Sequence, residues 1–164
     1  MFGIFDASIF HALALVDYAD DSKVKGVTAR EGWELNRWGI VTTGNDWEQF
    51  LTVGVERILG LSGGGDMGRF AGVASTGLNA TELHELPREE VERKMKEAVT
   101  DLLTRKGGKV SVVCLGCAAM VGLGDIVKET AKEIGYRPGE LKVVDGVTAG
   151  VLMLEGLLKG GYNA

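Results

Sequence analysis

Cys117 is the side chain whose type and position in this sequence are best suited to chemistry. It follows the apolar run from Val110 to Leu115, which predicts a buried strand, and it precedes a pattern that predicts a helix. A cysteine at such a junction lies near unpaired backbone amides and the positive end of the helix dipole, which favour the thiolate. Gly116, Ala118 and Ala119 are small enough to leave room for a substrate. The alternative is that Cys117 is a small buried hydrophobic residue, as most free cysteines are.

Cys114 lies within the predicted strand, and we expect it in the hydrophobic core. Together with Cys117 it forms a C-x-x-C pattern, which occurs in redox and zinc sites. An odd separation along a strand points two side chains to opposite faces, so we expect no disulfide. A zinc site would need further ligands, and only His11 and His84 could supply imidazoles. We therefore predict neither a redox pair nor a metal site.

Other polar residues also follow predicted strands, at the edge where ligands of parallel α/β sheets collect. Thr42 and Thr43 could donate hydrogen bonds to a substrate oxygen, or they could cap the next helix together with Asn45 or Asp46. Asp145 has the same two interpretations, and capping is the favoured one. The loops that qualify as parts of a site are 42–44, 76–79, 116–119 and 145–146.

Two further motifs carry little chemistry. His84 could act as a general base near the second of these loops, but a single histidine in a polar segment is more often solvated. Residues 63–68 satisfy the G-x-G-x-x-G pattern of dinucleotide sites. That fingerprint must follow a strand and open a helix, whereas here it follows a helix and leads into a strand. We interpret it as a flexible turn.

Strand and helix patterns alternate along most of the chain. Strands are predicted at 37–43, 70–76, 110–115 and 141–144. Between and after them, helices are predicted at 46–59, from Pro87 to Gly107, at 121–134 and at 147–158. This alternation predicts an α/β fold with a four-stranded parallel sheet flanked by helices.

The first residues fit this order less well. Phe2 to Phe5 resemble the end of a strand that has no evident partner, and a helix is predicted from about Asp6. Its apolar face would carry Ile9, Phe10, Leu13 and Val16. Residues 17–35 are predicted to form a long polar connection.

Composition limits the class of protein. The chain has 164 residues, enough for one ordinary domain, and its formal charge of −5 argues against a nucleic-acid or anionic membrane partner. No apolar run reaches the roughly 18 residues of a membrane span, and the N-terminus lacks the basic start of a signal peptide. Two cysteines in one short segment do not form a secreted disulfide scaffold, so we expect a cytoplasmic protein.

Two segments of this chain resemble the second half of the aspartate/glutamate/hydantoin racemase superfamily. They are Val113 to Met120 and Val143 to Gly150, and they are most similar to the branch of hydantoin or allantoin racemases. Gly3 to Ser8 and Gly39 to Thr43 also resemble segments of that branch. The resemblance therefore covers nearly the whole chain.

The resemblance implies a racemase without a cofactor, built from two similar α/β lobes that each contribute one cysteine. One thiolate removes a proton from the stereogenic carbon and the opposite thiol returns a proton to the other face. Cys117 matches the cysteine of the second lobe. By the same resemblance, and by their place at the same edge, the expected substrate-binding residues are Thr42, Thr43, Asn79, Gly116, Ala118, Asp145 and Gly146.

The chain departs from the family pattern in two ways. Ala118 and Ala119 stand where the amino-acid racemases have Thr-His, which favours a hydantoin-like ring over free glutamate or aspartate. The cysteine of the first lobe would precede Met1, so residues 1–36 are predicted to be the remnant of that lobe. Residues 37–146 would form the complete lobe, and residues 147–164 a helix that packs back on the first.

Three functions are consistent with these observations. The leading hypothesis is a cysteine-dependent racemase that acts on a hydantoin-type cyclic ureide, with reduced or no activity in so short a chain. A non-catalytic binding module is the second, because Phe2, Phe5, Phe10 and Trp33 would lack a complete core and favour a partner or a second copy. The third is a decarboxylase or cis-trans isomerase of the same superfamily.

Overall fold

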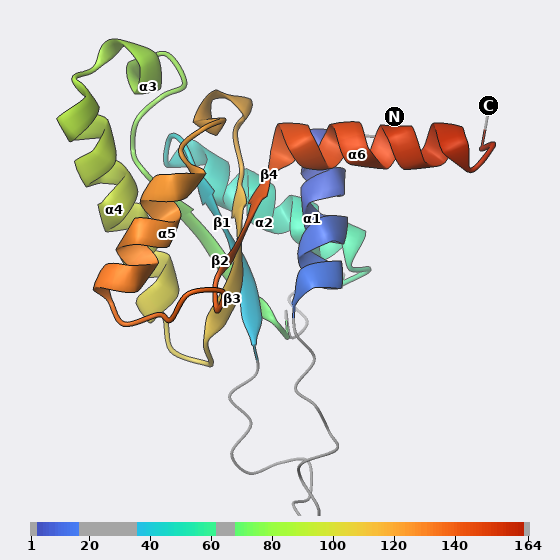
Figure 1. Cartoon of the computed structure of the whole chain (residues 1–164), viewed down its shortest axis with the longest axis horizontal. Helices are drawn as coiled ribbons and strands as arrows, with labels where there is room; N and C mark the ends of the chain where they lie inside the picture. Colours follow the sequence, from blue (N-terminus) through green and yellow to red (C-terminus); the bar gives the residue numbers. More distant parts are fainter. Residues whose placement is uncertain (1–2, 17–35, 62–67, 163–164) are drawn as a thin grey trace, which may run out of the picture.

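A four-stranded parallel sheet forms the centre of the chain, in a computed structural model that describes residues 3–16, 36–61 and 68–162 (Figure 1). The strand order is β2-β1-β3-β4, and each neighbouring pair is parallel. The strands are β1 (Arg37–Thr42), β2 (Phe70–Ser75), β3 (Val110–Leu115) and β4 (Lys142–Asp145). The predicted α/β fold with a parallel four-stranded sheet is therefore confirmed.

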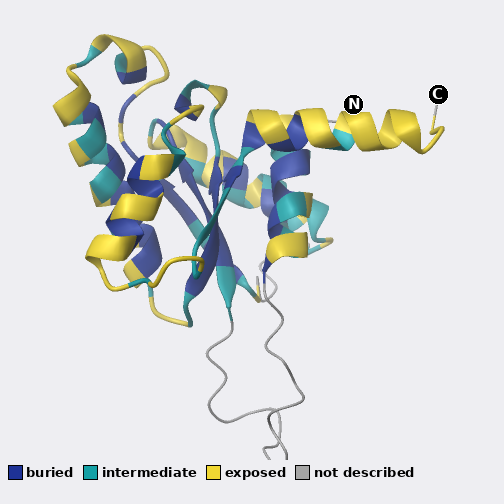
Figure 2. Cartoon of the chain, viewed as in Figure 1, coloured by how far each residue is buried: buried dark blue, intermediate teal, exposed yellow. Residues whose placement is uncertain are grey.

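Helices cover both faces of the sheet, and hydrophobic clusters fill the two interfaces. One face packs against α4 (Arg88–Thr104) and α5 (Gly124–Glu133), and the other against α1 (Ile4–Leu15) and α2 (Asp46–Ile58), as Figure 1 shows. The buried residues in Figure 2 concentrate in the sheet and on the helix faces that contact it. Because β3 is covered on both faces, all of its residues are buried, as its apolar sequence predicts.

Most predicted elements agree with the structure to within one or two residues. Pro87, where the helix was predicted to start, is instead the residue just before α4, and its side chain makes no cap hydrogen bond. One exception is the helix predicted at 121–134, which is shorter because a 3₁₀ turn, η2 (Ala118–Met120), and a glycine turn precede α5. Gly122 has a φ of +85°, a backbone conformation that breaks a helix, so α5 starts only at Gly124.

The strand predicted at Phe2 to Phe5 is wrong, because Ile4 and Phe5 are the first two residues of α1. The Asp6 carboxylate accepts a hydrogen bond of 2.9 Å from the Gly3 N–H and so closes the helix N-terminus. Phe5 instead packs against α2, and Ile4 contacts α6. A Cβ atom on Gly54 of α2 would lie 2.6 Å from the ring of Phe5, which shows how closely the two helices approach.

The described part of segment 1–36 is thus mainly one helix that packs on β3 and β4. The C-terminal helix α6 (Gly146–Lys159) crosses α1 and then extends beyond the body of the sheet (Figure 1). The division into segments 1–36, 37–146 and 147–164 stays a prediction. The polar connection at 17–35, the side chains of Phe2 and Trp33, and nearly all of the glycine motif at 63–68 lie outside the described residues.

In the described ranges, none of the helices has the length and apolar character that crossing a membrane requires.

Burial on the α2 side of the sheet gives a test of the core. Val55 is 0% exposed and Val53, on the same helix, is 45% exposed. Val55→Ala removes two buried methyl groups and leaves a cavity, so we expect it to lower the free energy of unfolding by about 2 kcal/mol. Val53→Ala should lower it by less than about 0.5 kcal/mol. Urea denaturation measures both, and equal losses would contradict this packing.

Candidate functional site

Cys117 lines a pocket of about 480 Å³ at the carboxyl edge of the sheet. Four other residues that the sequence predicts as part of the site, Thr43, Asn79, Gly116 and Ala118, line the same pocket. They come from the loops after β1, β2 and β3, which are neighbours in the sheet. The structure therefore brings together three of the four loops that the sequence predicted at one site.

Backbone hydrogen bonds continue past the strand ends and hold these three loops together. The Gly116 N–H donates to the Val41 carbonyl oxygen at 2.8 Å, and the Thr76 N–H donates to the Thr42 carbonyl oxygen at 2.9 Å. The first bond ties the Cys117 loop to the end of β1, and the second ties the Asn79 loop to it. The Gly116 amide is thus already paired within the protein.

Only glycine fits at position 116. A Cβ atom there would lie 2.7 Å from Ile40 Cγ2, 3.1 Å from Thr42 Cβ and 3.2 Å from Leu51 Cδ1. Since a distance below about 3 Å is far inside van der Waals contact, any larger residue would push the loop away from β1. This close approach sets the position of Cys117 at the pocket wall.

Cys117 itself is half-buried and has an extended backbone, with φ −138° and ψ 138°. The helix expected to begin directly after it is only the single 3₁₀ turn η2, and α5 begins seven positions later at Gly124. The dipole of a long helix therefore does not end at this sulfur, contrary to the sequence-based expectation. The side chain packs against the hydrophobic cluster beneath α4 and α5.

The two threonines after β1 differ in position. Both are buried, but Thr43 lines the pocket, whereas Thr42 lies beneath it against Gly116. Asn45 is the residue before α2, and its side chain makes no cap hydrogen bond to that helix. Its Oδ1 atom instead accepts a hydrogen bond of 2.5 Å from the Ser75 hydroxyl.

Asn79 enters the pocket from the loop after β2. Its Oδ1 atom accepts hydrogen bonds of 2.9 Å from the backbone N–H groups of Thr81 and Glu82, at the start of the short helix α3 (Glu82–Glu85). The carbonyl end of this side chain is therefore engaged, and its NH₂ group is the end left to donate to a ligand.

Asp145 and Gly146 do not line the Cys117 pocket. The Asp145 carboxylate caps α6 by accepting a hydrogen bond of 2.8 Å from the Thr148 N–H, which confirms the capping interpretation. Asp145 lines a separate depression of about 310 Å³ together with Thr148 and Lys128. Gly146 packs tightly, since a Cβ atom there would lie 3.0 Å from the Ser8 hydroxyl oxygen.

Cys114 faces away from Cys117, toward α1, which confirms that the two side chains lie on opposite faces. Both cysteines are free. The Cys114 thiol donates a 3.5 Å hydrogen bond to the Ser8 carbonyl oxygen. Burial raises the pKa of the Cys114 thiol from 9.0 to about 12, so it stays protonated at neutral pH.

Sequence patterns alone missed the apolar wall of the pocket. Ile4 and Phe5 from α1 and Trp47 and Leu51 from α2 form it. Ile4 and Phe5 were not expected at the site because their segment was assigned to a strand. Trp47 could have been found, since it falls in the first turn of a helix that begins just beyond a candidate loop. His84 lies exposed on α3 and does not line the pocket.

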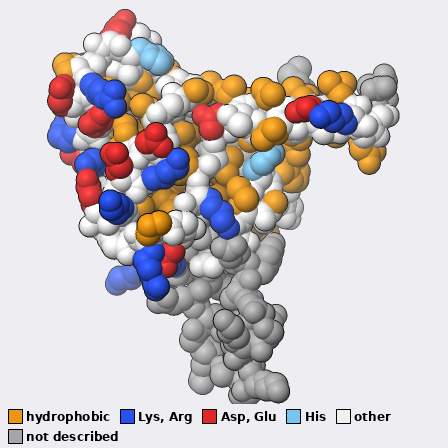
Figure 3. Space-filling view, viewed as in Figure 1, with side chains coloured by type: hydrophobic (Ala, Val, Ile, Leu, Met, Phe, Trp, Pro, Cys, Tyr) orange, Lys and Arg blue, Asp and Glu red, His pale blue; other side chains and the backbone are white. Residues whose placement is uncertain are grey.

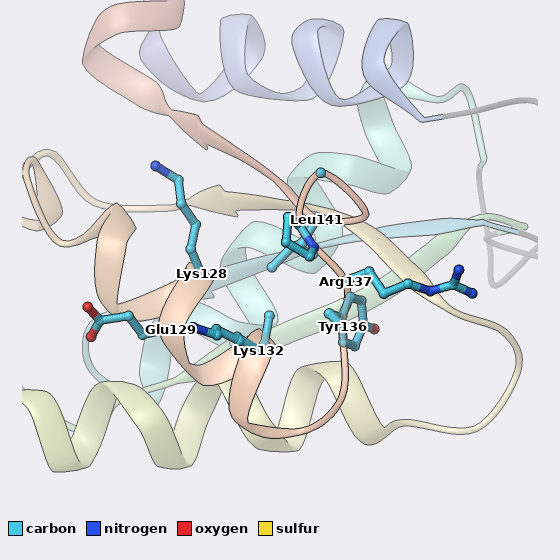
Figure 4. Close-up of a pocket in the computed structure, with 9 residues that line it drawn as sticks. Lys128, Glu129, Lys132, Tyr136, Arg137 and Leu141 are labelled. Carbon is cyan, nitrogen blue, oxygen red and sulfur yellow. The ribbon is translucent and has the colours of Figure 1, made fainter.

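A second pocket, of about 330 Å³, lies between α5 and the start of β4. Its floor is apolar and its rim carries Lys128, Glu129, Lys132 and Arg137. In Figure 4, Lys128, Glu129 and Arg137 extend away from one another rather than toward a common point. Arg137 pairs with Glu140, and Lys128 pairs with Asp125. This pocket therefore lacks the converging polar groups of a binding site.

Within ranges 3–16, 36–61 and 68–162, no three His, Cys, Asp or Glu side chains come close enough together to hold a metal ion.

Comparison with known proteins places the chain in a family. The family model described as Asp/Glu/Hydantoin racemase matches residues 1–154. The chain belongs to this racemase family. Two uncharacterized proteins of Schizosaccharomyces pombe are similar to it. One is 33% identical over 120 residues, which cover 73% of this chain and 45% of the relative, and the other is 32% identical over 91 residues, which cover 56% and 35%.

A solved structure with a similar fold is the allantoin racemase from Klebsiella pneumoniae. It matches 98% of this chain with a TM-score of 0.64 and 21% sequence identity. The match covers 51% of the allantoin racemase chain. This chain therefore spans about half the length of that structure, and less than half the length of the two yeast relatives.

The positions of the two cysteines predict different reactivity. Because iodoacetamide reacts with accessible thiolates, it should modify Cys117 in the folded chain at least about tenfold faster than Cys114. In urea both should react. Mass spectrometry of peptides measures the two rates, and Cys117→Ser is the control. Rapid labelling of Cys114 in the folded chain would contradict the structure.

The raised pKa of Cys114 also predicts how stability depends on pH. Above pH 9.0 the unfolded chain loses a thiol proton that the folded chain keeps until about pH 12. The free energy of unfolding should therefore fall as the pH rises from 9 toward 12, and this thiol should have no effect below pH 9. Urea denaturation measures the slope. Cys114→Ala should reduce it, and an unchanged slope would contradict the burial of the thiol.

Proposed function

We propose that this chain carries the proton-transfer half of a racemase that acts on a small cyclic ureide such as allantoin or a hydantoin. The observation that supports it most is the position of Cys117 in the 480 Å³ pocket beside Thr43 and Asn79. Membership of the racemase family supports the reaction class, and the fold of an allantoin racemase supports the choice of ring. The absence of a cofactor is part of the proposal.

In the proposed step the Cys117 thiolate removes the proton from the stereogenic ring carbon. The S–H bond forms, and the electron pair of the broken C–H bond moves into the neighbouring carbonyl to give an enolate. Hydrogen-bond donors on Thr43, Asn79 and the Ala118 backbone would stabilise the negative oxygen. Return of a proton to the opposite face completes inversion.

The composition of the pocket suits a flat ring with polar edges. Phe5, Trp47 and Leu51 supply an apolar wall, and the loops after β1, β2 and β3 supply the polar groups on other sides. A cyclic ureide has carbonyl and N–H groups around its rim and two open faces. Its faces would contact the apolar wall while its carbonyls accept hydrogen bonds from the loops.

The second proton donor of a two-thiol mechanism is not Cys114. That thiol is buried on the opposite face of β3 and its pKa is raised to about 12. On the described residues alone, water would return the proton to the ring carbon. We therefore expect this chain to exchange the ring-carbon proton with solvent more readily than it inverts the stereogenic carbon.

A non-catalytic binding module is the second candidate. The exposed apolar side chains on α1 and α6, among them Phe10 and Leu158, favour it because such surfaces usually contact a partner. A decarboxylase or isomerase of the same superfamily uses the same pocket chemistry and remains the third candidate. The cytoplasmic location stays a prediction.

Deuterium exchange tests the proposal. Allantoin or a substituted hydantoin in D₂O should exchange its ring-carbon proton faster with the protein than without it, as measured by NMR. Cys117→Ser should lower the catalysed rate by about 100-fold or more, because a general base is lost. Cys114→Ala is the matched control and should keep it. Unchanged exchange in Cys117→Ser, with the fold intact by circular dichroism, would rule out this function.

A further inference from the structure

Asp46 gives the wall of the Cys117 pocket its charge. It is the first residue of α2, it is exposed, and it lines the pocket beside Trp47. Of the twelve described residues that line this pocket, none is a lysine, an arginine or a histidine, and Asp46 is the single aspartate or glutamate. The pocket wall is therefore negative and offers no cationic side chain to an anionic group.

The Asp46 carboxylate is also available to a ligand, unlike other carboxylates near this edge of the sheet. Glu48 accepts a hydrogen bond of 2.9 Å from the Ser75 N–H. Glu82 accepts one of 2.7 Å from the Asn79 N–H. In the part of the chain that the structure describes, neither a hydrogen bond nor an ion pair engages the side chain of Asp46.

Lysine and arginine side chains gather away from this wall. Figure 3 shows many of them over α4 and α5, next to acidic side chains. Several pair there, for example Arg93 with Glu90 and Lys96 with Glu133. Because α4 and α5 cover one face of the sheet and α2 the other, these cations leave the charge of Asp46 uncompensated.

Aromatic rings beside this carboxylate narrow the kind of ligand further. Phe5 and Trp47 line the same pocket, and the centre of the Trp47 ring lies 6.1 Å from that of Phe50. The faces of such rings attract ammonium and guanidinium groups. A carboxylate and aromatic rings together are complementary to a cationic group on an apolar stem, whereas they repel a second carboxylate.

We propose that Asp46 selects ring substrates by the charge of their side chain, and that the pocket prefers a hydantoin whose side chain ends in an ammonium or guanidinium group. The inference rests on the proposed function for the identity of the ring. With the ring carbonyls at the polar loops, the side chain of the stereogenic carbon extends along the apolar wall toward Asp46. A terminal carboxylate is disfavoured there because like charges repel.

Binding of three hydantoins that differ in charge tests the proposal. Their side chains are aminopropyl, carbamoylethyl and carboxyethyl, and the last two have nearly the same shape. NMR titration of the protein at neutral pH measures each dissociation constant without requiring a reaction. We expect the cationic ring to bind at least about tenfold more tightly than the anionic one, with the uncharged ring between them, because two unit charges a few Å apart interact by about this much even in water.

Asp46→Asn is the decisive variant, and Glu56→Gln is its matched control. Glu56 lies on the same helix but lines a different depression, of about 650 Å³, so each substitution removes one negative charge from α2. In Asp46→Asn the affinities for the cationic and anionic rings should differ by less than about threefold. Glu56→Gln should keep the wild-type ratio. Circular dichroism checks that both variants keep the fold.

Equal affinity of the wild type for the three rings would overturn the proposal, and so would binding of none of them or a ratio that Asp46→Asn leaves unchanged. Proton exchange in D₂O, measured on the same rings, separates this inference from the proposed function. Binding ordered by charge without catalysed exchange would support the selectivity and contradict the reaction. Catalysed exchange with equal affinities would support the reaction and contradict the selectivity.

Discussion

The burial of β3 on both faces is the constraint from which the candidate site follows. A strand covered by helices on each side must send successive side chains to opposite cores, and its residues must all be apolar or small. Cys114 consequently enters the core beneath α1, while Cys117 emerges three residues later at the carboxyl edge. The same pattern that makes one thiol inert brings the other to a pocket.

Close packing at the strand ends then positions the residues that line the pocket. Gly116 can approach Ile40 and Thr42 because it has no Cβ atom, and its N–H extends the pairing between β3 and β1 by one more hydrogen bond. The Thr76 N–H does the same between β2 and β1. Loops distant in sequence are thereby held side by side. The polar side of the pocket is an extension of the sheet rather than a separate structure.

Five of the twelve residues that line the pocket come from α1 and α2, the helices on one face of the sheet. Ile4 lines the pocket and also contacts α6 near Gly150. The contact between α1 and α6 therefore lies next to the apolar wall of the pocket. The solved allantoin racemase is about twice as long as the part that this chain matches.

The sequence by itself determined the parallel sheet, the succession of strands and helices along the chain, and the separation of the two cysteines. These follow from local patterns: apolar runs, helical spacing and the two-residue alternation along a strand. The family was also evident from the segments around Cys117 and Asp145. Of the seven expected binding positions, Thr43, Asn79, Gly116 and Ala118 line one pocket with the sulfur.

Only the tertiary structure decided the rest. Phe5 lies in a helix, and its aromatic ring packs against Gly54, a contact between residues far apart in the sequence. Thr42 lies beneath the pocket and Asp145 outside it because the pairing of strands and the path of α6 set which side of each loop faces the sulfur. Local sequence specifies which way a chain turns, but the walls of a cavity depend on distances between segments that only packing brings together.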